Sequence, residues 1–425
     1  GCPPLGRIYL PNAAYAEMLE WSGGFWRNFL VKYPESNNMH KKMLRVHGKV
    51  RQAQAVVRRD VGEDDLWQGQ CNCAYWHGVF GGIYLRHIRH GVYRHLLEAE
   101  AKADAALHPV ASWLGWEKGD FDLDGADELM AESHIQNVYL DPAEGGSIFE
   151  WDLRQPRHNL SGVMTRHTEA YHQKLSQLQA AAETGGSEVK TIHDIEQAKQ
   201  AGLSEKLFYD WYNRASLIDH FLGQGTTLEG FSRTKYEESG DFVNQQYAAS
   251  ATRSGRRLLL HLARDGRIWY QGQHLAIKIE KVLGLTAGAA ALGVDYRITN
   301  ISGSALDCVF GSEWNLALGE PAHREGYSYR SGDGAWQPWH VAIGEASEVS
   351  GLSVADPEFR LKLALDIGHP ARVWRFPIET VSSSEEGFEL NYQGSSLLLS
   401  WPLRLEPQQI WEVKLGWKFE ALTKA

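Results

Sequence analysis

The densest group of residues able to contact a ligand lies between positions 68 and 82. This stretch combines two adjacent aromatic residues and two polar ones with four glycines: Asn72, Tyr75, Trp76, His77, Gly69, Gly78, Gly81 and Gly82. Glycines let a backbone approach a ligand closely, and aromatic rings offer flat apolar faces. The pattern therefore predicts a binding loop before a helix, which we call the glycine-rich loop. The alternative is that Tyr75 and Trp76 are core aromatics and His77 a hydrogen-bonded structural residue.

Two cysteines in the same loop superficially resemble a metal site. Cys71 and Cys73 are separated by one residue and precede His77. A closed zinc site needs four ligands and usually a Cys-x-x-Cys spacing, so this pattern disfavours a metal in the loop.

A second chemical signal is the acidic stretch 120–128, which we call the acidic loop. Asp120, Asp122 and Asp124 stand at alternate positions and Gly125 follows, as in the first half of an EF-hand-like calcium loop. The Glu expected at position twelve is missing, because Ala131 stands there. Calcium remains a candidate ligand of Asp120, Asp122 and Asp124, completed by Asp127 or Glu128, and the alternative is a plain acidic turn.

Other conspicuous residues lie further along the chain. Asp219 and His220 could pass for an acid/base pair, but a buried, hydrogen-bonded packing element explains them better. The β-region also contains scattered tryptophans, such as Trp314, Trp336, Trp339 and Trp374. We expect most of them to stabilise the core of the sandwich. Residues 333–339 are the best candidate for an exposed surface that binds glycans.

Hydrophobic periodicity predicts the elements that position these residues. Apolar side chains recur every three or four residues from 39 to 57 and again from 82 to 107, which predicts two amphipathic helices joined by an acidic connection at 60–70. Lys41, Lys42, Arg45 and Lys49 occupy the other face of the first helix. Pro109 ends the helical region.

After Pro109 the apolar residues alternate in short segments, as at 292–298 and 412–419. Alternation with a period of two predicts strands, and similar segments at 256–263 and 275–282 predict a large antiparallel β-sandwich. Helical insertions are expected at 166–183 and 192–200. The fold class is therefore α+β, with an N-terminal helical region of three-helix type followed by the sandwich.

The composition narrows the function. Forty-three Lys and Arg against 53 Asp and Glu give a net charge of −10, which argues against nucleic acid or an anionic membrane as partner. Sixteen Trp and 17 Tyr favour carbohydrate, because flat rings stack on sugars. Four scattered cysteines, no long apolar run and no signal peptide at Gly1 predict a soluble, cytoplasmic chain.

Collinear motifs give the chain a family resemblance. The run 70–82 resembles the last conserved stretch of family 57 glycoside hydrolases, in the branch of 4-α-glucanotransferases and α-amylases. Three further stretches agree with it, namely 9–18, 26–41 and 210–221. The resemblance implies a galactose mutarotase-like (supersandwich) β-domain, an α-glucan or maltooligosaccharide substrate, and contacts to it from Asn72, Cys73, Tyr75, Trp76 and His77. No cofactor is implied.

The resemblance also implies that the chemistry lies elsewhere. In that family a Glu nucleophile and an Asp acid/base, about 5 Å apart, carry out a retaining reaction. Both precede the segment that residues 9–18 resemble, so this chain alone is expected to be inactive. Cys73 departs from the family, which often has an Asp there, and a thiol is a poorer acceptor than a carboxylate. Residues 1–20 would end a catalytic barrel, 21–109 form the helical domain with the glycine-rich loop, and 110–425 form the sandwich.

Partners and alternatives follow from the same resemblance. The catalytic barrel upstream is the expected protein partner, and a homodimer is a further candidate because the family is often oligomeric. A non-catalytic glucan-binding or scaffold module is the main alternative. An α-mannosidase-like hydrolase fits residues 70–82 less well.

Overall fold

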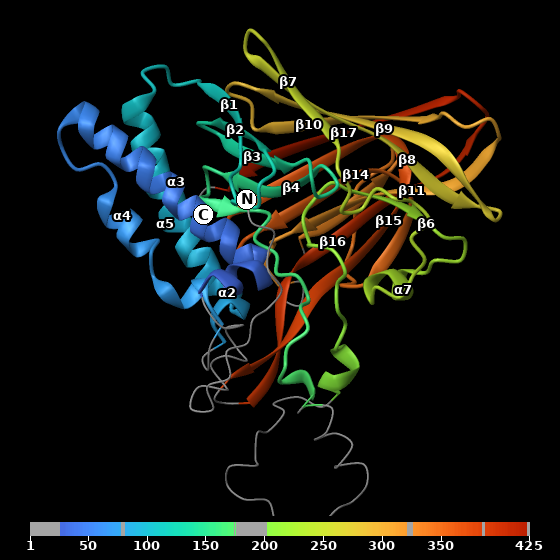
Figure 1. The fold of residues 1–425 in the computed structure, drawn as a ribbon, viewed down its shortest axis with the longest axis horizontal. Helices are drawn as coiled ribbons and strands as arrows, with labels where there is room; N and C mark the ends of the chain where they lie inside the picture. Colours follow the sequence, from blue (N-terminus) through green and yellow to red (C-terminus); the bar gives the residue numbers. More distant parts are fainter. Residues whose placement is uncertain are drawn as a thin grey trace, which may run out of the picture.

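A computed structural model describes residues 26–77, 81–173, 175, 202–320, 326–384 and 387–422. Helices fill the described part up to Leu107 and strands dominate it from Leu114 onward. In Figure 1 the helices lie on one side, a small sheet lies beside them, and a large β-sandwich forms the other side. The predicted α+β fold, with helices followed by an antiparallel sandwich, is confirmed.

The helical region consists of two long helices and several short turns. The long helices α3 and α5 pack on each other through Val46, Val50, Leu96 and Ala99, which are fully buried. Pro34 begins α3, where a missing N–H does no harm, and Arg58 ends it in the left-handed conformation. The elements are α2 (Trp26–Lys32), α3 (Pro34–Val57), α4 (Glu63–Gln68), η2 (Asn72–Tyr75), η3 (Gly82–Tyr84) and α5 (Arg86–Leu107).

Three predicted helix boundaries need correction. The second long helix begins at Arg86 and not at position 82, because Gly81 and Gly82 have φ angles of +90° and +51°, outside the helical region. The acidic connection contains α4, whose first turn carries three acidic residues that favour a helix start. Residues 166–169 of the predicted insertion have no regular secondary structure; most of the remainder, and the insertion at 192–200, lie outside the described residues.

The first sheet has five antiparallel strands in sequential order and lies next to the helices. Its central strands are buried along their whole length, because the helices cover one face and the sandwich the other. The strands are β1 (Leu114–Gly119), β2 (Glu128–Ser133), β3 (Gln136–Asp141), β4 (Ser147–Leu153) and β5 (His158–Asn159).

The remaining twelve strands form one sheet that folds into a sandwich. The order β13-β12-β14-β15-β17-β10-β9-β8-β7 makes one layer, and β16, β11 and β6 continue from β15 into the other. Strand β15 joins both layers, since its first part pairs with β17 and its second part with β16. The bounds are β6 (Ile218–Leu222), β7 (Ala248–Ser254), β8 (Arg257–Tyr270), β9 (Gln273–Thr286), β10 (Ala291–Asn300), β11 (Leu306–Leu316), β12 (Tyr327–Ser331), β13 (Gln337–Pro338), β14 (Gly344–Asp356), β15 (Leu361–Ser384), β16 (Gly387–Leu405) and β17 (Ile410–Ala421); the short helices η4 (Leu203–Lys206) and α7 (Leu228–Ser232) lie in connections.

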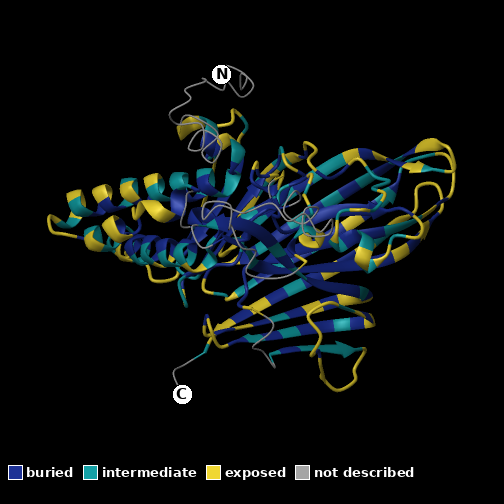
Figure 2. Cartoon of the chain, turned by 90° about the horizontal axis from the view of Figure 1, so that it is seen from below, coloured by how far each residue is buried: buried dark blue, intermediate teal, exposed yellow. Residues whose placement is uncertain are grey.

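Alternating burial along the outer strands confirms the period-two prediction. In β9, every second residue from Leu275 to Leu285 is buried, and Figure 2 shows buried and exposed residues alternating along the strands. Trp151, Trp314 and Trp417 pack together where the first sheet meets the sandwich, with ring centroids 5.2 to 6.1 Å apart. Trp374 and Trp339 are also buried, so three of the four tryptophans named from the sequence lie in the core, and Trp336 is exposed.

Buried charges join the helices to the first sheet. Lys42 was expected on the polar face of its helix, yet it is fully buried and its Nζ contacts Asp152 at 2.7 Å and Glu100 at 3.0 Å. Although burial opposes its charge, these carboxylates hold the pKa of Lys42 above its usual value. The basic face of α3 therefore faces the acidic residues of the sheet.

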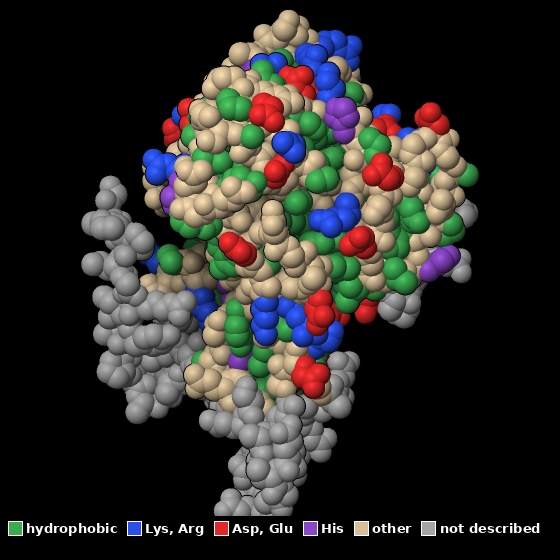
Figure 3. Space-filling view, turned by 90° about the vertical axis from the view of Figure 1, so that its right-hand side faces the viewer, with side chains coloured by type: hydrophobic (Ala, Val, Ile, Leu, Met, Phe, Trp, Pro, Cys, Tyr) green, Lys and Arg blue, Asp and Glu red, His purple; other side chains and the backbone are tan. Residues whose placement is uncertain are grey.

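The surface is consistent with the charge argument. On the face in Figure 3, basic and acidic side chains are interspersed and do not gather in a patch of one sign. None of the helices in the described ranges has the length and hydrophobicity to cross a membrane.

Candidate functional site

The glycine-rich loop is held in place by its own backbone and by the helices. Ser36 on α3 donates its hydroxyl to the carbonyl of Tyr75 at 2.5 Å, and the Tyr75 hydroxyl donates to the carbonyl of Gly69 at 2.6 Å. A Cβ on Gly69 would lie 2.4 Å from Cδ2 of Leu96, so a side chain at this position would collide with α5. The ring of Tyr75 is therefore part of the helical core, and burial raises its pKa.

Trp76 is half-buried and packs beside Phe29, Ile83 and Tyr84. Its carbonyl accepts a hydrogen bond from the N–H of Ile83 at 2.8 Å, which closes the loop on itself. A Cβ on Gly82 would lie 2.1 Å from this same carbonyl oxygen, and the φ of Gly82 is +51°. The closure therefore needs glycine at position 82, and Trp76 remains partly exposed.

Asn72 and Cys73 are exposed at the start of the loop, and the Cys73 thiol lies 3.5 Å from the amide oxygen of Asn72. Their polar atoms are open to solvent and can contact a ligand. Cys71 is also exposed, whereas His77 is buried, so the loop separates the two cysteines from the histidine.

His77 is fully buried and connects the loop to a segment from the β-region. Its ring nitrogens lie 3.3 Å from the Gly81 carbonyl and 3.1 Å from the Tyr171 hydroxyl. Burial lowers the pKa of His77 to about 4, so the ring is neutral at neutral pH. The His77 side chain thus fixes the end of the loop against the segment that carries Tyr171. We call the segment that carries Tyr171, residues 163–173, the strap.

Glu169 of the strap is the main anchor beneath the loop. Its carboxylate accepts hydrogen bonds from Lys32, Tyr33 and Tyr84, each at 2.6 Å. Burial alone would raise the pKa of Glu169, but Lys32 and these hydrogen bonds hold it below its usual value. Glu169 was not predicted as a site residue, because it fell in an expected helical insertion and no local motif marks it.

The sandwich contacts the turn that follows the loop through β16. The side-chain amide of Gln393 donates to the carbonyl of Tyr84 at 2.9 Å and its oxygen accepts from Arg89 at 2.7 Å. Segments 309 positions apart in the sequence therefore fix the same turn. The loop has a rigid frame built from the helices, the strap and the sandwich.

A separate cleft of about 1490 Å³ opens between the helices and the β-region. Residues from α2, α3, α5, the acidic loop and the strap line it, and the exposed residues 72 and 73 do not. Its walls carry both basic and acidic side chains. The basic ones include Lys32, Lys41 and Arg214, and the acidic ones include Glu35, Asp141 and Glu144. Burial, followed by repulsion from neighbouring carboxylates, raises the pKa of Asp141 to about 6.

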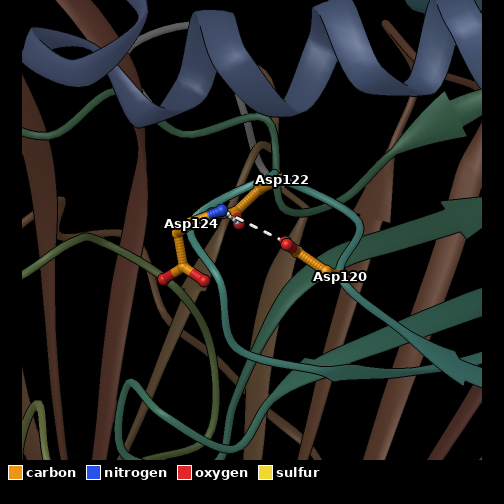
Figure 4. Close-up of side chains that lie close together, drawn as sticks. All are labelled: Asp120, Asp122 and Asp124. Carbon is orange, nitrogen blue, oxygen red and sulfur yellow. Dashed lines mark hydrogen bonds between the residues drawn. The ribbon is translucent and has the colours of Figure 1, made fainter. Parts of the chain in front are cut away.

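The acidic loop forms part of the cleft wall and brings together three of the four predicted metal ligands. The carboxylate oxygens of Asp120, Asp122 and Asp124 lie within 4.8 Å of one another. Figure 4 shows Asp120 and Asp122 turned toward the backbone N–H of Asp124, which donates to both at 3.1 Å. Asp127 is not in this group, because its carboxylate lies 3.7 Å from Lys118 instead.

The Asp219–His220 pair is buried and hydrogen-bonded as expected, but the two side chains serve separate networks because neighbours on a strand point to opposite faces. Asp219 contacts Lys281 at 2.9 Å. His220 lies between Glu238 at 2.7 Å and Glu313 at 2.9 Å. Both networks stabilise the sandwich.

The glycan surface expected at 333–339 is partly formed. Trp336 is exposed and lies against the guanidinium of Arg330, with 5.2 Å to the ring centroid, whereas Trp339 is buried. A single exposed ring gives a weaker surface than the predicted pair.

Comparison with known proteins identifies the family. The family model described as "Alpha-amylase/4-alpha-glucanotransferase, C-terminal" matches residues 120–415, and the one described as its "middle domain" matches residues 24–103. The chain is 34% identical to "Alpha-amylase 1" of Dictyoglomus thermophilum over 97% of its own length and 61% of that protein. It is 32% identical to a 4-alpha-glucanotransferase of Thermococcus litoralis over 95% of its length and 59% of that protein.

A solved structure agrees with these matches. The crystal structure of the 4-alpha-glucanotransferase from Thermococcus litoralis superimposes with a TM-score of 0.73 at 30% identity, covering 98% of this chain and 61% of that chain. The chain thus spans about three-fifths of the length of these relatives. The two matched regions coincide with the helical region and the β-region, and the chain therefore belongs to the α-amylase/4-α-glucanotransferase family, glycoside hydrolase family 57.

Proposed function

We propose that this chain is the helical and β-sandwich part of an enzyme that processes α-1,4-glucans, either a 4-α-glucanotransferase or an α-amylase. In this proposal the glycine-rich loop contacts the glucan, and a Glu nucleophile and an Asp acid/base outside this sequence carry out a retaining reaction. The names of the matched family models, "middle domain" and "C-terminal", support this division of labour.

The partial exposure of Trp76, in the same loop as the exposed Asn72, is the observation that carries the proposal. A sugar ring that stacks on an aromatic face and donates hydroxyl hydrogen bonds to an amide is bound through both its apolar and its polar parts. The buried residues Glu169, His77 and Gln393 fix the backbone on the C-terminal side of Trp76, so little conformational freedom is lost there when a ligand binds.

Cys73 favours a second candidate function. If a carboxylate at this position shapes the active site in relatives, the exposed thiol weakens that contribution, and the chain would bind glucan without supporting turnover. A non-catalytic glucan-binding module remains the alternative. A cytoplasmic location and a homodimer stay predictions.

Binding of maltoheptaose to the Trp76→Ala variant tests the role of the loop. We expect the variant to bind at least about tenfold more weakly than the unmodified chain in isothermal titration calorimetry, a loss of about 1.4 kcal/mol. Trp269→Ala, which removes an exposed tryptophan of β8 outside both candidate glucan surfaces, is the matched control and should bind normally. Equal affinities of the Trp76 variant and the unmodified chain, with both folded by circular dichroism, would reassign Trp76 to the core.

A further inference from the structure

The acidic loop holds an arrangement of carboxylates that the proposed glucan function does not use. It connects β1 to β2 and turns sharply at Leu123 and Gly125, which have φ angles of +66° and +99°. This turn brings the carboxylates of Asp120, Asp122 and Asp124 within 4.8 Å of one another (Figure 4). Three neighbouring negative charges repel one another unless a cation lies between them.

A fourth carboxylate lies beside the same turn, although it is not part of the group of three whose oxygens all lie within 4.8 Å of one another. Glu128 begins β2 and is 1% exposed, and its Oε2 accepts a hydrogen bond from the N–H of Phe121 at 2.5 Å. Phe121 stands between two of the aspartates, so this bond fixes the Glu128 carboxylate within the loop. Its other oxygen, Oε1, is buried and has no hydrogen-bond partner among the residues that the structure describes. Burying such an oxygen without a partner is unfavourable, and a bound cation would satisfy it.

Among the residues described, no ion pair with the protein's own cations neutralises this group, but Lys41 interacts with it: burial lowers the pKa of Lys41, and the negative charges of Asp122 and Asp120 oppose that shift. Within the described ranges, no Lys, Arg or His side chain lies within 4.0 Å of the carboxylates of Asp120, Asp122, Asp124 or Glu128. Lys118 contacts Asp127 at 3.7 Å, and Lys41 donates its ammonium to the amide oxygen of Asn37 at 2.8 Å. Lys41 therefore offsets part of the negative charge without forming an ion pair, and the remaining charge is available to an ion from solution.

The position of the loop gives an ion both access and a structural effect. Asp122, Asp124 and Glu128 line the cleft, so an ion can reach them from solvent. On the other side the amide of Asn37 on α3 donates to the backbone carbonyl of Asp122 at 2.8 Å. An ion that orders the loop would therefore also strengthen the contact between the loop and α3.

We propose that Asp120, Asp122, Asp124 and Glu128 form a binding site for a hard divalent cation, and that this cation is Ca²⁺. All four ligands offer carboxylate oxygens, which favours hard cations over zinc or copper. Calcium accepts six to eight oxygens in irregular geometry, whereas magnesium demands a regular octahedron, and an irregular turn suits the former. The sequence pattern allowed either Asp127 or Glu128 as the fourth ligand, and the proposal assigns this role to Glu128. The site is independent of the glucan function.

Calorimetric titration of the complete 425-residue chain with CaCl₂, after treatment with EDTA and desalting, tests the proposal. We expect saturable binding of one ion per chain and a rise in Tm that NaCl of equal ionic strength does not reproduce. Asp122→Asn and Glu128→Gln should each weaken binding at least about tenfold, because the charge and number of the ligands set calcium affinity. Asp127→Asn is the matched control, since it removes the same charge from the same loop outside the site, and it should leave the affinity unchanged within about twofold.

Three outcomes would overturn the proposal. The first is an absence of heat and of any Tm change with 10 mM CaCl₂, a concentration about tenfold above the Kd of the weakest calcium sites of proteins. The second is an equal loss of affinity in Asp127→Asn and Asp122→Asn, which would indicate diffuse surface charge and no site. The third is tighter binding of MgCl₂ than of CaCl₂, which would exclude calcium as the preferred ion. Because the first and third outcomes are measured on the unmodified chain, they test the site even if a variant does not fold.

Discussion

Removal of the Glu169 carboxylate tests whether the strap holds the glycine-rich loop in place. In Glu169→Ala the hydroxyls of Tyr33 and Tyr84 lose their common acceptor, and the ammonium of Lys32 loses its partner at 2.6 Å. Each buried hydroxyl left without a partner costs about 1–3 kcal/mol, and breaking a buried ion pair costs about 3–5 kcal/mol. One carboxylate serves all three groups, so these contributions overlap, and we expect a total loss of about 3–5 kcal/mol.

The conservative variant separates charge from hydrogen bonding. Glu169→Gln keeps an oxygen that can accept from both tyrosines, but its amide N–H₂ faces the Lys32 ammonium, so we expect an intermediate loss of about 2–3 kcal/mol. Glu229→Gln is the control, because the Glu229 side chain is 74% exposed and pairs only with Arg233 within the described residues. It should change the free energy of unfolding by less than about 0.5 kcal/mol.

Guanidinium unfolding followed by tryptophan fluorescence measures these differences, and maltoheptaose titration of the same variants measures the effect on the loop. We expect Glu169→Ala to bind the glucan more weakly than Glu229→Gln, because Trp76 would no longer be held in one position. A stability of Glu169→Ala within about 1 kcal/mol of the unmodified chain would refute the reasoning, since it would mean that the three contacts contribute almost nothing.

Three further predictions concern the frame of the molecule. Lys42→Ala should lower the free energy of unfolding by about 3–5 kcal/mol in guanidinium titration, because it leaves buried carboxylates unpaired; a loss below about 1 kcal/mol would contradict this. Gly82→Ala, whose Cβ would lie 2.1 Å from the Trp76 carbonyl oxygen, should speed hydrogen exchange in the loop, whereas Gly91→Ala on α5, with nothing within 4 Å, should not. His220 has a pKa that burial would lower but its two carboxylate neighbours raise to about 9, so its stabilising contribution is complete below about pH 6.5 and is lost as the pH rises through about 9. Unfolding titrations at pH 7 and 9.5 should therefore show a loss on the order of 3 kcal/mol that His220→Gln reduces, and an unchanged pH dependence in that variant would assign the effect to other groups.

The strands and long helices could be predicted from the sequence because their hydrophobic periods are local signals. The alternation at 275–282 places the same residues in β9 that the structure buries. The start of α5 could not be placed in this way, since the left-handed Gly82 is fixed by its closure against Trp76 and not by the apolar pattern of the helix.

The candidate site was predictable only in part. The glycine-rich loop is marked by its own residues, but Glu169 and Gln393, which hold it, come from distant segments without any local motif. Lys42 shows the same limit, because a lysine on the polar face of an isolated helix looks exposed until a sheet with acidic residues packs on it. Hydrophobic periodicity describes one element at a time, and these contacts depend on how elements meet.

Disproportionation and hydrolysis of maltoheptaose by the 425-residue chain alone, with glucan binding measured in parallel, test the central claim most directly. We predict saturable binding that depends on Trp76 and no release or transfer of glucose units, because the catalytic Glu and Asp are proposed to lie outside this sequence. Turnover by the purified chain would contradict this claim, since the pair of catalytic carboxylates would then have to lie within these residues.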